Sequence, residues 1–386
     1  MKKYCIRPFN NIWIVPSITK QGKQRYSPCC HYLPRDEKNS IDEYLESPEL
    51  LQLQKHFLTE DTYPQGCEVC QSADNDGHES STRILHSKNR PVLTETSIDI
   101  IEVVPSKICN LRCFMCNPAT SSAFEAEYKA LGWIENIVNA DQDDQVIKDI
   151  QKFDSLKTVS ILGGEFFLIK KNLEILDLIV EKKLAVKLTT NATVILDSHL
   201  DKLKQIKDLD ITVSMEGTGI VYEFMRYPGN WETVNKNITT LKKSLPHASL
   251  QINSVIQPLN VQYIGDIIDY ANSKIIPLRL SKLDIPKWLG WEILNPDESK
   301  LIIKFLEDTK LSIRMTKGQL KSIDSFINSL EVSVYTPEFR KLFVSKMSQL
   351  MSYRQISKET IREIFGILNS LCNELIDAMD QLAYNK

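Results

Sequence analysis

Three cysteines stand close together in the first third of the chain with the spacing C-x3-C-x2-C. They are Cys109, Cys113 and Cys116, and nine cysteines in 386 residues hardly produce this spacing by chance. Closely spaced thiolates on one loop suit soft metal ions, and three of them leave one iron of a four-iron cluster without a protein ligand. Because an open iron can bind a substrate or cofactor, the spacing predicts an iron-sulfur site at which chemistry takes place.

A structural zinc ion is the alternative occupant of this loop. Zinc of that kind takes four protein ligands, generally as two well-separated pairs. The sequence downstream of Cys116 offers no nearby His or Cys as a fourth ligand. Three thiols alone therefore favour the iron-sulfur interpretation.

A second group of cysteines lies near the start of the chain: Cys5, the adjacent Cys29 and Cys30, and the C-x2-C pair Cys67 and Cys70. In a reducing compartment, clustered cysteines indicate metal or redox chemistry before disulfide bonds. The odd total of nine also fits poorly with a complete set of disulfides. We therefore expect a small amino-terminal domain organised by metal.

The overall composition is that of an ordinary globular protein. Its 47 basic and 50 acidic side chains give a formal net charge of -3, which argues against a protein that mainly coats nucleic acid or anionic membrane. No window approaches the 18 apolar residues of a membrane span, and the start of the chain lacks the apolar run of a signal peptide. We expect a cytoplasmic protein with no membrane segment and no strong nucleic-acid signal.

Short runs of β-branched and apolar residues alternate with helical patterns through the middle of the chain. About 30 residues fall to each strand and helix pair, which is typical of βα units and predicts an α/β fold with a parallel sheet or an open barrel. The expected strands are 98–104, 158–162, 185–190, 209–215, 250–256 and 275–283, with helices such as 172–183 and 234–243 between them and 121–153 as the first crossover.

The two ends of the chain are expected to differ from this middle part. The amino-terminal part is polar and irregular, with one helix predicted over 41–57. The carboxyl-terminal part is strongly helical, and the expected helices are 298–309, 316–329, 337–351 and 358–382. The sequence thus predicts three regions, 1–94, 95–290 and 291–386.

The loop from Lys107 to Cys116, directly after the first expected strand, resembles the cluster motif of the radical S-adenosylmethionine (radical SAM) superfamily. In that family the three thiolates hold a [4Fe-4S] cluster whose fourth iron binds SAM, and reductive cleavage yields methionine and a 5'-deoxyadenosyl radical. The resemblance implies a partial (β/α)6 TIM-like barrel over residues 95–290 and makes Cys109, Cys113 and Cys116 the catalytic ligands. It also places Met115, at a position that is commonly aromatic, near the adenine of SAM.

Residues after the second and third expected strands fit the same resemblance. Gly163, Gly164 and Glu165 resemble the family's GGE motif, which meets the SAM amino group. Physically, the two glycines let backbone approach a ligand closely, and the carboxylate accepts a hydrogen bond from an ammonium group. Thr190 and Asn191 resemble the polar pair that often follows the third strand.

Three polar residues follow the fourth expected strand. Ser214 and Glu216 match positions that contact the ribose and carboxylate of SAM in the family, and Arg226 matches a carboxylate-binding arginine. The alternative is that these are ordinary solvated residues at strand ends. Their joint location at the carboxyl ends of strands, where α/β sheets and barrels bind ligands, favours a functional role.

The amino-terminal cysteines resemble the SPASM or twitch modules of radical SAM enzymes, placed here before the core. The resemblance implies an auxiliary [4Fe-4S] cluster with the ligands Cys5, Cys29, Cys67 and Cys70, and with Cys30 as an alternative to Cys29. A zinc ribbon with the same four thiolates is the alternative, because a tetrahedral four-thiolate site suits zinc equally well.

Other residue types that often do chemistry are assigned no catalytic role. The six histidines show no metal-ligand spacing, and Cys372 lies on an apolar helical face, as a buried core residue would. Trp288 and Trp291 either line a substrate entrance or serve as packing residues.

The resemblance as a whole implies an enzyme that abstracts hydrogen from a substrate and takes its electron from a donor such as flavodoxin or ferredoxin. Because SPASM and twitch relatives often modify ribosomally made peptides, a peptide is the expected substrate. A small molecule, such as a nucleotide, sugar or amino-acid derivative, is the alternative substrate. A non-enzymatic zinc or iron-sulfur interaction protein is a third interpretation, which the intact GGE and cysteine motifs oppose.

Overall fold

The structure is a computed structural model that describes residues 3–16, 24–32, 36–75, 82–135, 145–283 and 285–384. The chain divides into two compact units, each of which is described by itself. Unit 1 comprises Met1–Arg112, Cys116–Val213 and Thr233–Leu250, and unit 2 comprises Cys113–Met115, Ser214–Glu232 and Gln251–Lys386.

A mostly parallel sheet forms the centre of unit 1, in the strand order β3-β2-β1-β4-β5-β6-β7. β1 and β4 to β7 are parallel to one another, whereas β2 and β3 are antiparallel additions at one edge. The expected strands that fall here are confirmed. The strands are β1 (Asn11–Pro16), β2 (Gln24–Ser27), β3 (Asp36–Lys38), β4 (Ile100–Val103), β5 (Thr158–Ile161), β6 (Ala185–Thr190) and β7 (Leu209–Ser214, whose last residue belongs to unit 2).

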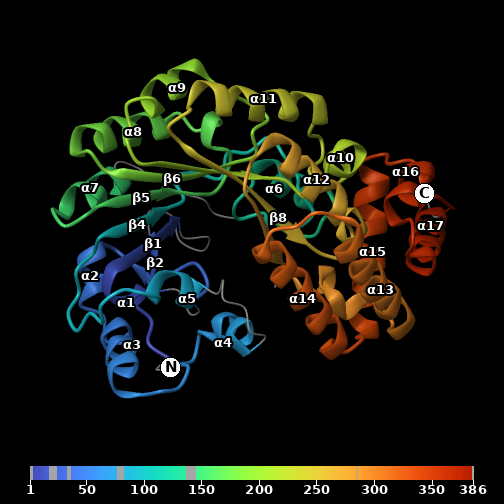
Figure 1. The fold of residues 1–386 in the computed structure, drawn as a ribbon, viewed down its shortest axis with the longest axis horizontal. Coiled ribbons are helices and arrows are strands. Elements are labelled where there is room, and N and C mark those ends of the chain that lie inside the picture. The colour runs from blue at the N-terminus through green and yellow to red at the C-terminus, as the bar shows by residue number, and fades with distance from the viewer. Residues whose placement is uncertain are drawn as a thin grey trace. The chain divides into compact units, whose positions relative to one another are not determined.

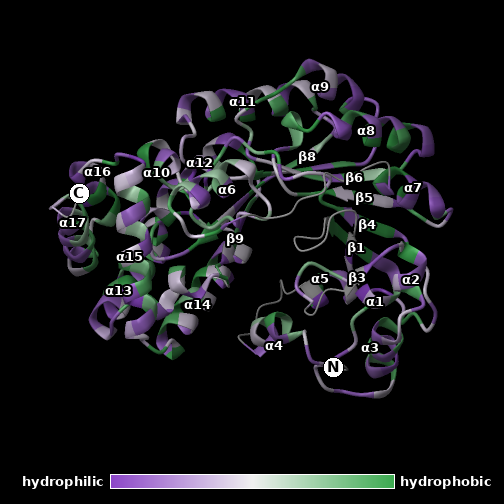
Figure 2. Ribbon diagram, turned by 180° about the vertical axis from the view of Figure 1, so that it is seen from behind, coloured by the Kyte–Doolittle hydropathy of each residue, from purple (hydrophilic) through white to green (hydrophobic). Residues whose placement is uncertain are grey.

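The sequence analysis anticipated none of the amino-terminal strands β1, β2 and β3, and β1 pairs with β4 from Asn11 opposite Ile100 to Ile14 opposite Val103. Amino-terminal residues therefore extend the same sheet that the later βα units build. Ile12 and Ile14 of β1 and Ile101 of β4 are fully buried, which is why these strands are apolar runs and do not alternate with polar residues. Figure 2 shows the hydrophobic residues of β1 and β4 side by side.

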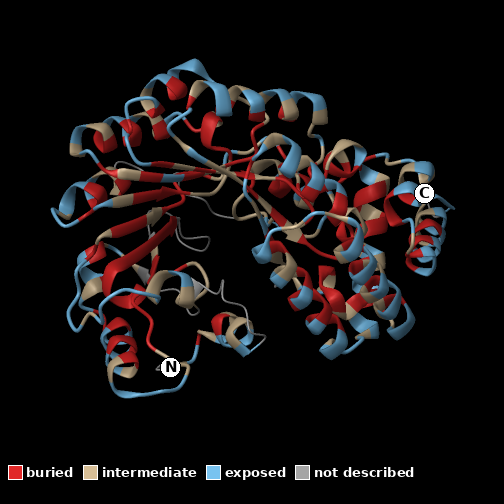
Figure 3. Ribbon diagram, viewed as in Figure 1, coloured by how far each residue is buried: buried red, intermediate tan, exposed pale blue. Residues whose placement is uncertain are grey.

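Helices α7 (Gln145–Lys152), α8 (Lys171–Lys182) and α9 (Asp197–Leu203) lie along one face of this sheet (Figure 1). Their outer turns are exposed, whereas the strands that they cover are buried (Figure 3). The expected helix 172–183 is confirmed as α8, and the expected crossover 121–153 contains α6 (Ser122–Ala130) and α7. Residues 136–144 of that crossover lie outside the described residues. The expected helix 234–243 is confirmed within α11 (Trp231–Ser244).

The amino-terminal helix expected over 41–57 is two helices in the structure, so that prediction was wrong in its continuity. The helix α2 ends at Leu45, and α3 begins at Pro48 with Ser47 as its N-cap, whose side chain accepts a hydrogen bond from Leu50. Proline disfavours helical backbone in the residue before it, so the break falls at Ser47. The helices here are α1 (Arg7–Asn10), α2 (Ile41–Leu45), α3 (Pro48–Thr59), α4 (Glu68–Asn75) and α5 (Thr82–Ser87).

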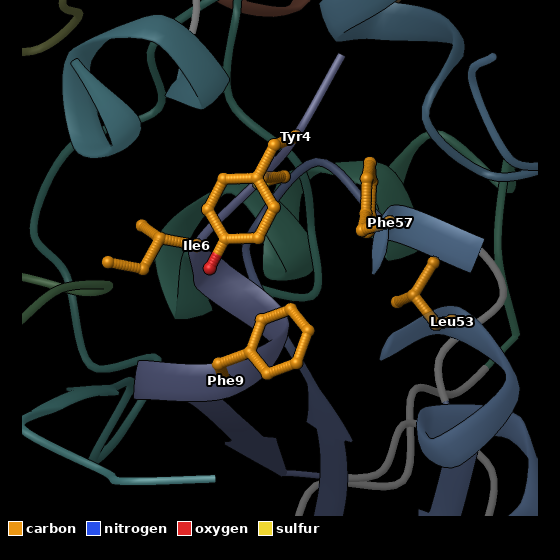
Figure 4. Close-up of a cluster of buried hydrophobic side chains, with 6 residues drawn as sticks. Tyr4, Ile6, Phe9, Leu53 and Phe57 are labelled. Atoms are coloured by element: carbon orange, nitrogen blue, oxygen red, sulfur yellow. The ribbon is translucent and has the colours of Figure 1, made fainter. Parts of the chain in front are cut away.

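A small apolar cluster joins α3 to the first described residues of the chain. Figure 4 shows the rings of Tyr4 and Phe9 with Leu53 and Phe57 of α3 close by. The Tyr4 and Phe9 rings stack with their centroids 5.8 Å apart. Cys5 belongs to this cluster and the half-buried Cys67 packs against it, so two of the amino-terminal thiols lie beside apolar side chains.

Unit 2 contains a parallel pair of strands and a helical carboxyl-terminal region. Both strands confirm expected ones: β8 (Ser249–Ile256, from Gln251 on in unit 2) and β9 (Leu278–Lys282). The helical region is confirmed as well. The α-helices of unit 2 are α10 (Gly219–Met225), α12 (Ile264–Lys274), α13 (Pro296–Ser312), α14 (Lys317–Val332), α15 (Pro337–Tyr353), α16 (Lys358–Phe365) and α17 (Asn369–Tyr384). The described residues of unit 2 also form the short 3-10 helices Val261–Tyr263, Lys287–Leu289 and Trp291–Ile293, and those of unit 1 form Phe166–Leu168.

The expected helix 358–382 is interrupted, and that prediction was wrong at the interruption. Gly366 ends α16 with a φ of +26°, a backbone conformation that side chains rarely adopt. A Cβ at this position would lie 2.7 Å from Oε1 of Gln262, so neither the φ angle nor the space suits a larger residue. The chain resumes as a helix at Asn369.

A buried arginine connects three helices of this region. Arg340 of α15 is 4% exposed and forms ion pairs with Glu298 of α13 and Glu374 of α17. Burial would lower the pKa of Arg340, but the two carboxylates outweigh burial and raise it. Among the described residues, no helix is both long enough and apolar enough to cross a membrane.

Candidate active site

The segment that carries Cys109 follows β4 and is held by the first turn of α6. The Cys109 amide donates to Oγ of Ser122 over 3.1 Å, and that hydroxyl in turn donates to the Cys109 carbonyl. The Cys109 sulfur accepts from the Leu111 amide at 3.5 Å and from Nδ2 of Asn191 at 3.8 Å. Burial raises the pKa of Cys109, with smaller contributions in the same direction from Cys116 and Glu165.

The Cys116 thiol lies in the turn that leads into α6. Its sulfur is 3.6 Å from Oγ1 of Thr120, and either atom can be the donor. Ser121 caps α6 by accepting from the Phe124 amide, and its hydroxyl donates to the Leu111 carbonyl over 2.8 Å. The cap of α6 therefore also closes the cysteine loop.

The Gly163-Gly164-Glu165 segment follows β5 and packs directly against the cysteine loop. Gly163 and Gly164 have φ angles of +74° and +54°, which only glycine adopts readily. A Cβ on Gly164 would lie 2.5 Å from the Ile108 carbonyl oxygen, and a Cβ on Gly163 would collide with Val104. The Glu165 amide donates to the same Ile108 carbonyl over 2.7 Å. The two glycines thus let this turn approach the residues that precede Cys109.

The Glu165 carboxylate is fully buried and binds the segment that follows β6. It accepts from Oγ1 of Thr190 at 2.6 Å, from the Asn191 amide at 2.7 Å and from the Phe167 amide at 3.2 Å. These donors stabilise the ionised carboxylate and lock two strand ends together.

Asn191 links this carboxylate to the cysteine loop. Its backbone binds Glu165, and its Nδ2 donates to the Cys109 sulfur and to Oδ1 of Asn110 at 3.2 Å. Thr193 completes the network by donating to Oδ1 of Asn191 over 2.6 Å. The sequence analysis selected Glu165 and Asn191 but missed Asn110 and Thr193. The available signal for Asn110 was its polar side chain inside the cysteine motif, and that for Thr193 was its position just after a strand end.

In unit 2, Cys113 and Phe114 are buried beside α10. The Phe114 amide donates to the Met225 carbonyl over 3.3 Å, and its ring lies 5.0 Å from that of Phe224. The guanidinium carbon of Arg354 lies 4.4 Å from the centroid of the Phe114 ring, which is cation-π geometry. Met115, the next residue, is half-buried.

Arg226 and Glu216 form a buried ion pair in unit 2. Nε and Nη2 of Arg226 donate to the two carboxylate oxygens of Glu216, the second over 2.9 Å, so the pair is bidentate. Nη1 of Arg226 donates to the Cys113 sulfur over 3.7 Å. Burial would lower the pKa of Arg226, but Glu216 and Cys113 reverse that effect and raise it. Both side chains expected near SAM are therefore already paired with each other, and Ser214 is half-buried at the end of β7.

Each sulfur of the C-x3-C-x2-C loop thus has a polar partner: Asn191 at Cys109, Arg226 at Cys113 and Thr120 at Cys116. A four-iron cluster needs thiolates, and donors at sulfur stabilise the thiolate form and tune the metal. Three thiols on one loop with such donors fit a [4Fe-4S] cluster with one open iron. In the ligand-free arrangement of the described residues, no three His, Cys, Asp or Glu side chains are placed to hold one metal ion.

The amino-terminal thiols come together from three separate segments of unit 1. Burial, together with the nearby Cys29 and Cys70, raises the pKa of Cys5 to about 12. Burial is also the main cause that raises the pKa of Cys67, followed by Cys29 and Cys5. These mutual effects mean that Cys5, Cys29, Cys67 and Cys70 lie within electrostatic reach of one another.

Cys30 packs in a different direction from Cys29. It contacts the apolar cluster of Trp13, Val15 and Val104. Cys30 raises the pKa of Cys29, as expected for an adjacent residue.

Residues assigned no chemistry by their sequence context are packing residues. Cys372 is buried in α17, and Trp291 is buried in the 3-10 helix Trp291–Ile293. The Trp288 ring lies 6.5 Å from that of Phe343 in α15. His199 is buried beside Phe166, and burial lowers its pKa.

Comparison with known proteins gives a family for the part of the chain that carries this site. The family model described as Radical SAM superfamily matches residues 103–271. Among curated proteins, GTP 3',8-cyclase of Synechocystis sp. is 25% identical over 178 residues, which cover 45% of this chain and 51% of that protein. The chain therefore spans about half the length of this curated relative.

Two of the similar solved structures illustrate the range of relatives. Native anSMEcpe with bound AdoMet is 17% identical, with 61% of this chain and 64% of that chain covered and a TM-score of 0.42. SuiB of Streptococcus suis bound to the precursor peptide SuiA is 16% identical, with 75% and 57% covered and a TM-score of 0.40. The family match over residues 103–271 begins in β4 and includes the cysteine loop and the GGE segment, so the part of the chain that carries the candidate site is similar to the radical SAM superfamily.

Proposed function

We propose that this enzyme holds a [4Fe-4S] cluster through Cys109, Cys113 and Cys116, binds SAM at the open iron and modifies its substrate by hydrogen abstraction. When bound, the cluster and SAM together supply a 5'-deoxyadenosyl radical, which is chemistry that protein side chains lack. The observation that carries the proposal is the construction of the cysteine loop, in which each sulfur has a polar partner and the GGE turn lies against the loop.

The chain's own residues have two tasks in this proposal. Gly163, Gly164 and Asn191 follow the carboxyl ends of β5 and β6, where they orient the cysteine loop and offer backbone and amide groups to SAM. Glu165 holds the two strand ends together, and its carboxylate is proposed to meet the SAM amino group.

After β7, Ser214 and Glu216 are proposed to serve the ribose and carboxylate ends of SAM, with Arg226 as the partner of Glu216. Met115 lies beside the buried Phe114 and is proposed to pack near adenine. The partial (β/α)6 barrel over residues 95–290, with 1–94 as an amino-terminal module and 291–386 as a helical region, belongs to the same proposal. It is supported by the six strands β4 to β9 at the expected positions.

We further propose that Cys5, Cys29, Cys67 and Cys70 hold an auxiliary [4Fe-4S] cluster, as a SPASM or twitch module would. The support is that four thiols from distant segments influence one another electrostatically, whereas Cys30 packs against Trp13. A zinc ion on the same four thiolates is the alternative occupant.

The proposed substrate class is a ribosomally made peptide, and the proposed electron donor is a flavodoxin or ferredoxin. A nucleotide is the second candidate substrate, because the curated relative at 25% identity is named a GTP 3',8-cyclase.

The test is anaerobic reconstitution with iron and sulfide, followed by dithionite, SAM and an assay for 5'-deoxyadenosine. We expect about eight irons per chain and formation of 5'-deoxyadenosine. Zinc in place of iron, with no cleavage of SAM, would overturn the proposal. A candidate peptide or GTP is then added, and the rate of SAM cleavage is measured with each. The compound that accelerates SAM cleavage more identifies the substrate class.

A further inference from the structure

Arg7 is a buried cation with hydrogen-bonding capacity that the described residues do not use. It lies in α1, two residues after Cys5, and is 1% exposed. Its Nη2 pairs with the Glu102 carboxylate of β4. Its Nε and Nη1 are buried, and among the described residues they have no hydrogen-bond partner.

Arg7 lies close enough to the amino-terminal thiols for its charge to act on them. The charge of Arg7 acts on Cys5, Cys29 and Cys70, where it opposes the effect of burial on each thiol. The Arg7 backbone likewise opposes the effect of burial on the pKa of the Cys5 thiol. One guanidinium therefore lies within reach of three of the four proposed ligands.

The carboxylate that pairs with Arg7 is also tied to the turn that carries Cys29. Nδ2 of Asn11 donates to Glu102 over 3.3 Å and to the Pro28 carbonyl over 2.8 Å. The Ser27 hydroxyl donates to the Cys29 carbonyl over 2.8 Å. Asn11 of β1 and Glu102 of β4 thus form one polar network that connects Arg7 to the turn that carries Cys29.

A buried guanidinium with unmade hydrogen bonds is unfavourable, because its N–H groups have lost water and gained no partner. Glu102 balances the charge but leaves Nε and Nη1 unsatisfied. Thiolates that bind metal are anionic and accept hydrogen bonds, so a metal-thiolate centre would supply the acceptors that Arg7 lacks.

We propose that Arg7 donates hydrogen bonds through Nε and Nη1 to a [4Fe-4S] centre held by Cys5, Cys29, Cys67 and Cys70, and that it raises the reduction potential of that centre. The inference rests on the proposed auxiliary cluster. Positive charge and N–H donors near cluster sulfur favour the reduced, more negative state. Arg7 is therefore a positioning and tuning residue of the second centre.

The test uses the full chain with Cys109, Cys113 and Cys116 replaced by alanine, so that only the amino-terminal centre can take up iron. Iron content, the EPR spectrum of the reduced centre and its potential are measured for Arg7→Gln, Arg7→Lys and Glu102→Gln. Arg7→Gln should lower the potential or lose iron, and Arg7→Lys should fall between Arg7→Gln and arginine. Glu102→Gln should raise the potential, because Arg7 then keeps its charge without its counter-ion.

Arg340→Gln is the matched control, because Arg340 is likewise buried and paired with carboxylates but lies in the helices of unit 2. It should lower the melting temperature without moving the potential. The same Arg7 and Glu102 substitutions are also made in the otherwise native chain, and its iron content is measured. This second set of variants shows whether the triple alanine substitution affects the result.

An unchanged potential and EPR spectrum in Arg7→Gln, with iron fully retained, would overturn the inference and leave the proposed enzyme untouched. Zinc without iron at the amino-terminal thiols would overturn both the inference and the auxiliary cluster. Formation of 5'-deoxyadenosine by the native chain, measured in parallel, separates these failures from a failure of the proposed function.

Discussion

The two groups of cysteines in this protein are built in opposite ways. The three thiols of the loop from Cys109 to Cys116 are neighbours along the chain, and each of them meets a polar partner. The amino-terminal thiols come from three separate segments, and two of them, Cys5 and Cys67, lie beside apolar side chains such as those of Tyr4 and Phe9. The first arrangement is suited to a cluster that must also bind an external ligand, and the second to a centre closed off from water.

The comparison also shows where each group obtains its buried positive charge. Arg226 donates to the Cys113 sulfur while it is paired with Glu216, and Arg7 lies near the amino-terminal thiols while it is paired with Glu102. In both groups a carboxylate holds the arginine in place. A buried ion pair next to thiols thus recurs at two sites whose sequences share no motif.

The largest expected effect separates catalysis from the second centre. Cys113→Ala should abolish formation of 5'-deoxyadenosine, because it removes a proposed ligand of the proposed SAM-binding cluster. Cys67→Ala should leave some cleavage of SAM that is uncoupled from product. The measurement is 5'-deoxyadenosine per chain after reconstitution, with Cys372→Ala as a control at a buried cysteine outside both groups. Equal and complete loss of folded protein in the first two variants would contradict this division of labour.

The next effect concerns the choice between two adjacent cysteines. Cys29→Ser should lose about four of the eight irons expected per chain, because it removes one ligand of the amino-terminal centre. Cys30→Ser should retain them, since Cys30 packs against Trp13, Val15 and Val104. The measurement is iron and sulfide content after desalting. The reverse pattern would make Cys30 the ligand.

A third prediction concerns how strongly the cysteine loop depends on its neighbours. Gly164→Ala should destabilise the protein by about 3 kcal/mol, because its φ is +54° and the new Cβ would meet the Ile108 carbonyl oxygen. Gly132→Ala is the matched control: its φ is +69°, but no atom lies within 4 Å of the new Cβ, so about 1 kcal/mol is expected.

Denaturant unfolding of the two glycine variants measures these costs, and the rate of SAM cleavage should fall for Gly164→Ala alone. An equal loss of unfolding free energy in the two variants would show that the cost at Gly164 comes from backbone strain and not from the contact with the cysteine loop.

The smallest effect tests the packing of the amino-terminal strands. Burial raises the pKa of Asp149 in α7 to about 6, and this carboxylate acts electrostatically on the buried Tyr26 of β2. A carboxyl group with a raised pKa favours folding while it is protonated, so stability is lost as pH rises from about 4 to 6. Asp149→Asn should therefore stabilise the protein by about 2 kcal/mol at pH 7 and by nothing near pH 4.

Thermal unfolding at several pH values measures this effect, and Asp177→Asn at an exposed position of α8 serves as the control. A constant difference between Asp149→Asn and the native chain from pH 4 to 7 would show that Asp149 does not titrate in this range.

The sequence predicted the later strands well because each is a local run of apolar residues long enough to recognise. It missed β1 because Asn11–Pro16 becomes a strand by pairing with β4, whose residues come much later in the chain. The break before Pro48 was readable from proline alone. The break at Gly366 was less so, because it also reflects the contact with Gln262, which lies in a different element.

At the candidate site, the sequence identified residue types more successfully than their partners. Glu165 was expected to face SAM, yet its closest partners are Thr190 and Asn191. Arg226 was expected to bind a carboxylate, and in the structure it is paired with that of Glu216. The sequence analysis did not select Arg7, because a single arginine in a polar segment has no characteristic spacing to other residues.

The sequence by itself determined the C-x3-C-x2-C loop and the alternation of strands and helices, because these are patterns among residues close together in the chain. Only the tertiary structure decided which donors meet which sulfurs and which cations are buried. Asn191 reaches Cys109 across 82 positions of sequence, and Arg226 reaches Cys113 across 113. Contacts of that kind depend on which strands are neighbours in the sheet and on how loops close over them, and no local spacing encodes either.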